Sequence, residues 1–450
     1  MKPQSPRTLV LFNFDWDRLG FGRWTREFPI DHAGFDLFSF PSKLRVLGFD
    51  LTRFVDRLAA RAQRAGWQAV VSNHEQFGAL AAAMLAERMG WPGTPVGAVL
   101  ACQHKLHARR VLQSVAPEAN TGFELMAWRY GEPVPDDIAY PVFVKPVKAA
   151  FSVLARKVRN RDELSALTRF SRRDLWLIGN LLDPVERMVQ ARLPEAGSVH
   201  RMLLEQPVTA RQYNLDGYVF GGDLRELGVV ESVMYTGTQS FMRFDYPCAM
   251  PAAGRARAAD VARRFLAATG FSHGLFNMEF FYDEVQDRLT VIEFNPRMAA
   301  QFSDLYLRVD GVDLHRVALE LAHGRDPALL PHAQATAGLA SSVVYRSFDP
   351  AARPAMPSAA RRRELALQFP DAMLFCFPKT GGQIARDFKW LGSYRYGIVH
   401  LGGRDTTDLA ARCAAASRLL GWPNPCARVD VQADPSPCRL APALSLRSHR

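Results

Sequence analysis

Residues 290–297, TVIEFNPR, begin as an apolar strand and end in polar side chains. Val291 and Ile292 favour the extended conformation, whereas Pro296 cannot donate a ladder hydrogen bond and stops the strand. Three polar residues follow one another at every second position and therefore share one face of the strand: Glu293, Asn295 and Arg297. The strand end thus presents an acid, an amide and a guanidinium together.

The apolar stretch before this strand predicts a hairpin over residues 275–297. With the connecting loop centred on Gln286, two polar pairs lie opposite each other: Glu279 with Glu293, and Asn277 with Asn295. A register shifted by one residue would break both pairs, because it moves every side chain to the other face. The matched positions therefore predict a polar cluster inside an otherwise apolar hairpin.

Two carboxylates directly opposite each other lie about 5 Å apart and repel. We expect a divalent cation between them, bound by Glu279, Glu293 and Asn295. Magnesium fits, as a hard cation that takes carboxylate, amide and phosphate oxygens, and Mn²⁺ is the alternative. In the competing interpretation, one glutamate points to solvent or pairs with Arg297. If Arg297 does not pair with a glutamate, its planar guanidinium suits a phosphoryl group in transfer.

Bulk properties narrow the class of protein. A chain of 450 residues predicts two or three domains, and 48% hydrophobic with 22% charged residues is ordinary for a globular enzyme. No apolar run approaches the roughly 20 residues that span a bilayer. Polar residues follow too soon after the N-terminus for a signal-peptide core. The six cysteines form no CxxC pair, which favours a reducing cytoplasm and argues against structural zinc.

The net charge of +11 is spread along the chain, apart from short runs such as ARRRE. An anionic small substrate explains it as well as nucleic acid does, so we expect neither nucleic-acid nor membrane binding. Lysine is scarce, and half of the eight lysines fall close together in the sequence: Lys105, Lys145, Lys148 and Lys157.

Alternating strand and helix signals predict a parallel α/β domain over 1–104, with one helix from an Asp50 N-cap to Gly66. Residues 105–331 show an α+β pattern rich in antiparallel pairs. Residues 332–422 predict a small β-rich domain with one helix at 408–421, and 423–450 a poorly ordered tail.

The hairpin motif resembles that of the ATP-grasp superfamily, in which an acid on one strand precedes Glu-x-Asn-Pro-Arg on the next. NMEF and IEFNPR match in order and spacing. The superfamily includes carboxylate–amine ligases and carbamoyl-phosphate-synthase-like proteins. Three further stretches are similar to family segments: CQHKLHARRVL, YPVFVKP and LLEQPVTARQYNLDGYV. The resemblance covers about residues 1–330 and implies an ATP-grasp fold with a Rossmann-like N-terminal domain and a lid at about 141–203.

The resemblance implies roles for individual residues. Lys105 and Lys145 would contact the nucleotide phosphates, and Gln212 the ribose. Glu205, the backbone near Val208 and the apolar Phe281 would meet the adenine.

The sequence departs from the family in three places. Gln212 stands where the family usually has an acid for the ribose hydroxyls, although an amide can still accept and donate there. The lid loop, VKAAFSVLA, lacks the usual glycines, so that Lys148 and Ser152 would replace backbone amides as phosphate contacts. After Arg297 the chain reads MAAQFSDLY, not the Gln-Val-Glu-His of biotin-carboxylating members, which argues against bicarbonate chemistry.

The function implied is that of an ATP-dependent ligase that activates a carboxylate as an acyl phosphate and couples it to an amine. Lys145 and Arg297 would be catalytic. Two alternatives stay open, a kinase-like phosphotransferase and a nucleotide-binding module without turnover; a homodimer is compatible with the sequence. His200, Arg201 and Arg243 either shape the acceptor pocket or simply pack. Asp216 either lies on the solvated face of its strand or contacts the substrate, and Arg395 is either a surface residue or reaches an anionic substrate from the last domain.

Overall fold

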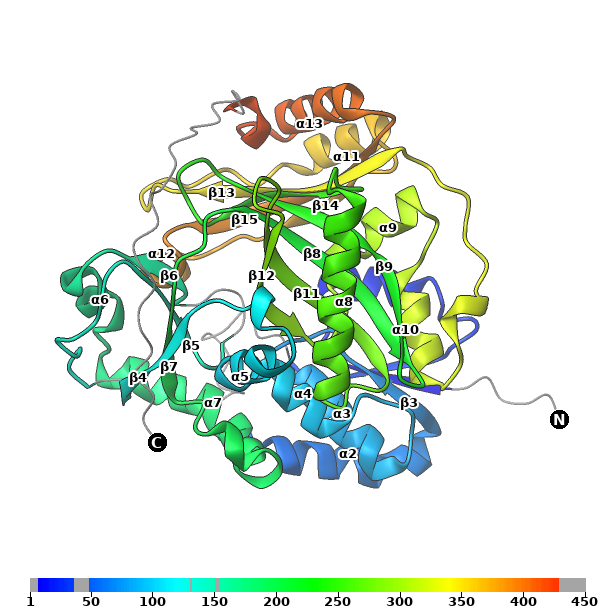
Figure 1. Cartoon of the computed structure of the whole chain (residues 1–450). Coiled ribbons are helices and arrows are strands. Elements are labelled where there is room, and N and C mark those ends of the chain that lie inside the picture. Colours follow the sequence, from blue (N-terminus) through cyan, green and yellow to red (C-terminus); the bar gives the residue numbers. More distant parts are fainter. Residues whose placement is uncertain (1–6, 36–47, 130–131, 150–153, 429–450) are drawn as a thin grey trace.

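The computed structural model describes residues 7–35, 48–129, 132–149 and 154–428 (Figure 1). It begins with a three-stranded parallel sheet in the order β2-β1-β3, flanked by four helices. The strands are β1 (Arg7–Leu11), β2 (Ile30–Ala33) and β3 (Trp67–Val71); the helices are α1 (Asp15–Gly22), α2 (Leu51–Ala65), α3 (Gly78–Met89) and α4 (Val96–Gln103). The predicted caps of α2 are confirmed, because Asp50 accepts from the Arg53 amide and Gly66 has φ +70°.

A four-stranded antiparallel sheet follows, in the order β4-β7-β5-β6. Its strands are β4 (Phe123–Arg129), β5 (Val142–Pro146), β6 (Arg156–Val158) and β7 (Arg201–Glu205). Helices α6 (Arg161–Thr168) and α7 (Arg172–Arg192) lie between β6 and β7 in the chain, and α5 (Lys105–Val115) precedes the sheet. We call this sheet with α6 and α7 the four-stranded unit.

The largest sheet has eight strands in the order β12-β11-β8-β9-β10-β13-β15-β14. They are β8 (Arg211–Phe220), β9 (Asp223–Met234), β10 (Phe241–Tyr246), β11 (Gly274–Asp283), β12 (Arg288–Asn295), β13 (Leu339–Ser347), β14 (Met373–Cys376) and β15 (Tyr394–Gly403). One face packs on α8 (Ala252–Ala268), where the Phe265 and Phe294 rings stack at 3.8 Å. The other face packs on α9 (Ser303–Val309) and α10 (Leu314–Ala322).

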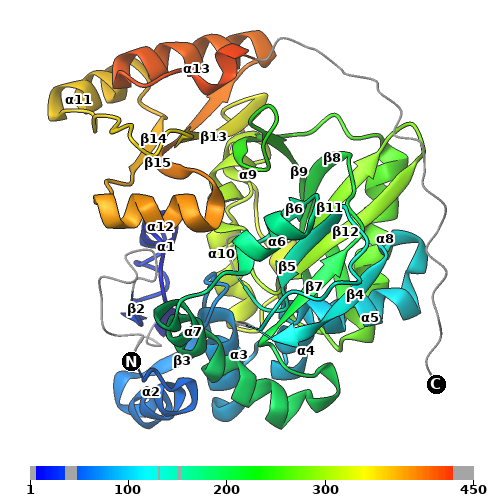
Figure 2. The same cartoon turned by 90° about the vertical axis from the view of Figure 1, so that its left-hand side faces the viewer.

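The C-terminal strands β13, β14 and β15 continue this sheet, and α11 (Ala359–Gln368) and α13 (Thr406–Leu420) pack on their outer face (Figure 2). The helix expected at 408–421 is confirmed as α13. Within residues 332–422, where one helix was expected, the structure has two more, α11 and α12 (Gly381–Leu391). Helix α12 begins with two glycines, which resemble a turn in the sequence, but Thr380 and Gln383 close a capping box that starts the helix. Five 3₁₀ turns complete the described chain: Pro117–Ala119, Pro194–Ala196, Ala300–Phe302, Pro327–Leu329 and Pro425–Arg428.

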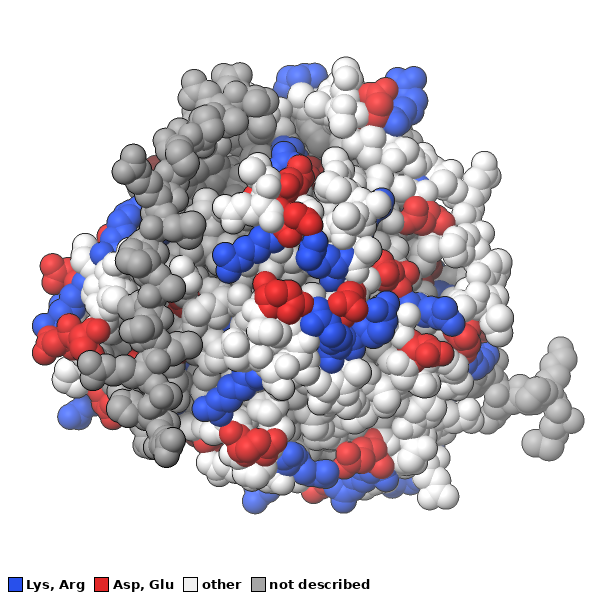
Figure 3. All heavy atoms as spheres, viewed as in Figure 1, with Lys and Arg blue, Asp and Glu red and all other residues white. Residues whose placement is uncertain are grey.

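Charges of both signs are mixed on one face of the molecule (Figure 3). On the face shown in Figure 3, lysine and arginine side chains lie beside aspartate and glutamate. Exposed ion pairs such as Arg257–Asp287 and Arg264–Glu118 are consistent with this mixture. No helix within the described ranges is long and apolar enough to cross a membrane.

Candidate active site

The hairpin of β11 and β12 places the predicted polar pairs opposite each other. Asn277 faces Asn295 and Glu279 faces Glu293, so the predicted pairing is confirmed. The outer half of the hairpin differs from the prediction, because a one-residue bulge at Ile292 shifts the register. The bulge leaves the Ile292 carbonyl free to accept from other elements.

Lys105, the first residue of α5, lies against the acidic pair. Its ammonium is 2.9 Å from the Glu293 carboxylate and donates to the Ala149 carbonyl at 3.1 Å. Burial alone would raise the pKa of Glu293, but the charge and hydrogen bond of Lys105, together with the charges of Lys145 and Arg297, outweigh burial and hold that pKa below its ordinary value. Glu293 is therefore an anion in the free protein.

The pKa of Glu279 is shifted in the opposite direction from that of Glu293. Burial, and next the charge of Glu293, raise the pKa of Glu279 above its ordinary value. Its carboxyl group accepts from the Gln212 amide at 3.0 Å and lies 3.4 Å from the Asn295 amide nitrogen. A cation bound between the two carboxylates would offset the repulsion that raises this pKa.

These donors fit a hard divalent cation, as two carboxylates and an amide gathered on one hairpin. The described residues contain no group of three or more His, Cys, Asp or Glu side chains placed to hold a metal. A cation at this hairpin would therefore need further oxygens from a ligand such as a phosphate chain.

Lys145 of β5 enters the same region from the four-stranded unit. Its ammonium lies 2.9 Å from Glu205 and donates to the Ile292 carbonyl at 3.2 Å. Burial lowers the pKa of Lys145 to about 8, although Glu205 opposes this shift. Lys145 therefore links the four-stranded unit to the strand that carries Glu293.

Glu205 is buried against two cations. Arg109 of α5 donates to its Oε1 atom at 2.6 Å, the same carboxylate oxygen that Lys145 contacts. Burial would raise the pKa of Glu205, but Arg109 and next Lys145 outweigh it and lower that pKa. Arg109 also donates to the carbonyls of Val291 at 2.7 Å and Ile292 at 3.2 Å. The Glu205 carboxylate is thus part of an ion-pair network. The resemblance predicts instead that this residue contacts the adenine.

The N-terminal unit contributes a residue that the sequence interpretation missed. Glu75, in the loop after β3, accepts from the Arg297 guanidinium at 2.8 Å and lies 3.5 Å from the Lys148 ammonium. Arg297 also donates to the Asn295 side-chain oxygen at 3.2 Å. Burial lowers the pKa of Lys148 to about 8. The position of Glu75 at the end of a parallel strand is the signal in the sequence, because such loops carry binding residues.

The remaining predicted residues lie along the neighbouring strands. Gln212 of β8 and Phe281 of β11 are register partners, and Phe281 is half-buried. Val208, also half-buried, lies in the linker between β7 and β8. Ser152 lies outside the described residues.

Asp216 is buried beside the hairpin, where it accepts from Asn277 at 3.1 Å and from the Tyr306 hydroxyl at 2.9 Å. Burial raises its pKa to about 7. Asp216 therefore holds Asn277 in place from the neighbouring strand. Three other candidates bond elsewhere: His200 with Asp183, Arg201 with the Met126 carbonyl, and Arg243 with Asp245.

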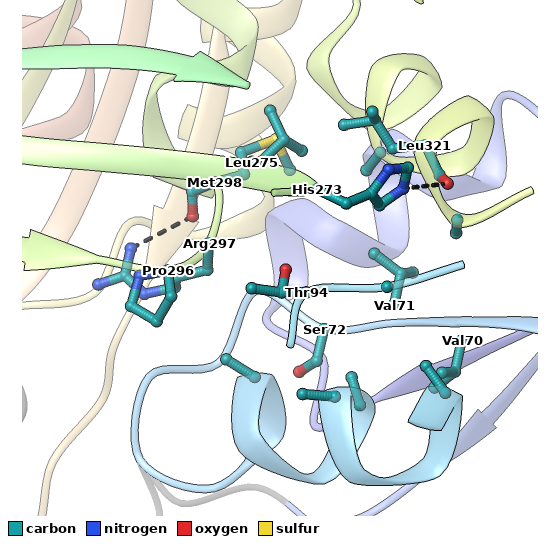
Figure 4. A pocket seen from close by; sticks show the side chains of 18 of the residues that line it. Val70, Val71, Ser72, Thr94, His273, Leu275, Pro296, Arg297, Met298 and Leu321 are labelled. Carbon is teal, nitrogen blue, oxygen red and sulfur yellow. Dashed lines mark hydrogen bonds between the residues drawn. The ribbon is translucent and has the colours of Figure 1, made fainter. Parts of the chain in front are cut away.

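A small cavity of about 70 Å³ lies next to this site (Figure 4). Its wall includes Ser72, Thr94, His273 and the 296–298 segment, and the His273 ring is bonded to the Leu321 carbonyl at 2.8 Å. Drug-sized ligands need several hundred Å³, so this cavity is a packing space between the N-terminal unit and the large sheet.

The chain combines three parts: a parallel α/β unit, a four-stranded antiparallel unit, and a large antiparallel sheet that ends in the hairpin of Glu279 and Glu293. Together they define the fold class of the protein. This arrangement is the ATP-grasp fold, and the chain has that fold. The fold predicted from the sequence is therefore confirmed.

Comparisons with known proteins agree. The D-alanine–D-alanine ligase of Synechococcus sp. (strain CC9605) is 32% identical over 169 residues, 37% of this chain, and the chain spans 43% of that curated relative. The L-amino acid ligase of Bacillus licheniformis superposes with a TM-score of 0.67 at 14% identity, over 93% of this chain and 98% of the other. The N5-carboxyaminoimidazole ribonucleotide synthetase of Thermus thermophilus superposes with a TM-score of 0.59 at 17% identity, over 92% of this chain and 98% of the other. No family model matches the sequence.

Proposed function

We propose that the protein is an ATP-dependent ligase that joins a carboxylate to an amine and releases ADP and phosphate. The opposed Glu279 and Glu293 carboxylates carry the proposal, because they fit a dication that bridges a phosphate chain. Lys105, Lys145 and Lys148 surround this hairpin with the positive charge that such a chain requires. Because the reaction consumes ATP, the proposal places it in the cytoplasm.

In this proposal, the substrate carboxylate attacks the γ-phosphorus and the bond to the β-phosphate oxygen breaks, which gives ADP and an acyl phosphate. The amine then attacks the acyl carbon, loses a proton, and phosphate leaves. Magnesium held by Glu279, Glu293 and Asn295 would neutralise phosphate oxygens. Arg297 would face the phosphoryl group in transfer, and Lys145 would hold the chain in place.

Release of phosphate distinguishes this function from its two alternatives. The ligase frees phosphate when carboxylate and amine are both present, a kinase-like enzyme forms ADP without free phosphate, and a binding module forms neither. A panel of carboxylates and amino acids, screened first by thermal shift with ATP and Mg²⁺, supplies the substrates for this assay. If no carboxylate and amine in the panel cause the protein to form ADP from ATP, the proposal is contradicted.

Nucleotide affinity is expected to fall as the pH rises. Lys145 and Lys148 are fully charged well below pH 8, and each loses its charge as the pH passes its pKa of about 8. We expect affinity for ADP with Mg²⁺ to fall about tenfold between pH 7 and about 9.5, as measured by isothermal titration calorimetry. The Lys148→Gln variant should bind more weakly and depend less on pH. Equal affinity at both pH values would contradict the role given to these lysines.

Replacing Glu75 by glutamine is expected to lower turnover more than nucleotide affinity. The amide keeps the shape but removes the charge that holds Arg297 at 2.8 Å. A guanidinium misplaced by about 1 Å lowers kcat by about 10- to 100-fold. Steady-state ADP formation measures this, with Glu87→Gln on α3 as the control, because Glu87 is exposed and pairs with Arg192. An unchanged kcat in Glu75→Gln would remove Glu75 from the site.

A further inference from the structure

Helix α5 begins at a buried histidine that bonds to two segments of the chain. His104, the residue before the first turn of α5, is only 1% exposed. Its Nδ1 atom accepts from the His107 backbone amide at 3.2 Å and so caps the helix. Its Nε2 atom lies 3.1 Å from the carbonyl of Gly197, which is 93 residues further along the chain, between α7 and β7. The side chain therefore joins the start of α5 to a distant segment.

These two bonds fix which ring nitrogen of His104 carries the proton. A carbonyl oxygen only accepts, so Nε2 is protonated and donates to Gly197. A backbone N–H only donates, so Nδ1 keeps its lone pair for His107. Burial lowers the pKa of His104 to about 4, and the ring is therefore neutral near pH 7. Each end of the neutral ring thus has its own partner.

The next residue is Lys105, whose ammonium faces the acidic pair of the hairpin. Its backbone amide donates to the Val147 carbonyl at 3.0 Å, and its ammonium donates to the Ala149 carbonyl at 3.1 Å. Both carbonyls lie directly after β5, whereas the Gly197 carbonyl lies before β7. The start of α5 is thus attached to the four-stranded unit at two separate segments, and His104 provides the buried attachment to the second.

A second bond from α5 to the same region lies at the surface. Arg110 donates to the Glu195 carbonyl at 3.2 Å, and this contact is exposed. Water can replace an exposed donor, whereas the loss of a buried donor leaves its acceptor unsatisfied. We therefore expect the buried bond of His104, rather than the bond of Arg110, to determine where α5 starts.

We propose that His104 is a positioning residue that holds the start of α5 against the Gly197 segment and thereby places the Lys105 ammonium for the nucleotide phosphates. The nucleotide role of Lys105 rests on the proposed ligase function. The connection through His104 rests on the two hydrogen bonds of its ring. In the competing interpretation, His104 only caps the helix, as asparagine or serine would.

Two substitutions separate the connection from the cap. His104→Asn keeps an acceptor near the position of Nδ1 but is too short to reach Gly197. His104→Gln keeps a donor near the position of Nε2 but is a poor cap. We expect both variants to melt about 1–3 °C below the wild type. By isothermal titration calorimetry, His104→Asn should bind ADP with Mg²⁺ about five- to tenfold more weakly than the wild type, and His104→Gln within about twofold of it.

The matched control is Arg110→Gln, which removes the exposed bond to the same region and should bind ADP within about twofold of wild type. The cap interpretation predicts the opposite order, with weaker binding by His104→Gln than by His104→Asn. That order, or equal affinities of the two variants, would overturn the proposal.

A double-mutant cycle tests whether His104 acts through Lys105. Lys105→Met should itself weaken ADP binding, and adding His104→Asn to it should change the affinity by less than about twofold. If His104→Asn weakens binding by the same factor with and without Lys105, the residue does not act through the lysine and the proposal fails.

Failure of the ligase proposal is seen separately, as absence of ADP binding to the wild type. The connection is then measured without nucleotide, by amide hydrogen exchange of Lys105 and of residues 194–201. These amides should exchange faster in His104→Asn than in His104→Gln. Equal exchange rates in the two variants would show that His104 does not hold the two segments together.

Discussion

The Glu293→Gln variant is expected to lose ADP formation by about 10³-fold or more while it keeps the fold. Glutamine removes the charge that faces Glu279 across the hairpin, and the loss of a metal's charge stabilisation is worth several kcal/mol. The amide has nearly the same volume, and Lys105 keeps its bond to the Ala149 carbonyl. A coupled assay for ADP measures the loss, and circular dichroism with thermal melting checks the fold.

The matched control is Glu284→Gln, in the loop of the same hairpin. Glu284 is exposed and lies 3.7 Å from Arg211, away from the acidic pair. Its substitution should leave turnover within about twofold of wild type. Turnover of Glu293→Gln in that range would exclude a metal at this hairpin.

The Glu205→Ala variant is expected to unfold far more easily than the wild type. The change leaves Arg109 and Lys145 buried without the carboxylate that both contact, at 2.6 and 2.9 Å. Removing one partner from such a buried network costs about 3–5 kcal/mol. The midpoint of urea unfolding, followed by tryptophan fluorescence, measures the loss.

Glu124→Ala supplies the comparison, because Glu124 is exposed on β4 and its register partner is Leu204, the neighbour of Glu205. It should change the free energy of unfolding by less than about 0.5 kcal/mol. If Glu205→Ala matches this control in stability but binds ADP more weakly, the carboxylate acts on the nucleotide, as the sequence interpretation had it, rather than on the fold.

Local patterns carried the correct predictions. The pairing of Glu279 with Glu293 followed from two apolar strands with polar residues at matched positions, and one register buries both apolar faces. The α2 helix followed from Asp50 and Gly66, whose roles as caps depend only on neighbouring residues.

Contacts between distant segments could not be predicted in the same way. Glu75 and Arg297 are 222 residues apart, and nothing in either stretch identifies the other. The bulge at Ile292 depends on how β12 meets Lys145 and Arg109, which come from other elements. Ser152 and the phosphate roles of the lysines stay predictions, because they concern a ligand rather than the fold.

Arg109 has a consequence for how the molecule behaves in a crowded solution. Strand β12 is the last strand on its side of the eight-stranded sheet in the described chain, and an outer strand with free carbonyls invites pairing with a second chain. Arg109 donates hydrogen bonds to two carbonyls of this strand, those of Val291 and Ile292. The side chain that neutralises Glu205 thus also shields the sheet margin against aggregation, so a substitution at this position would reduce solubility as well as stability.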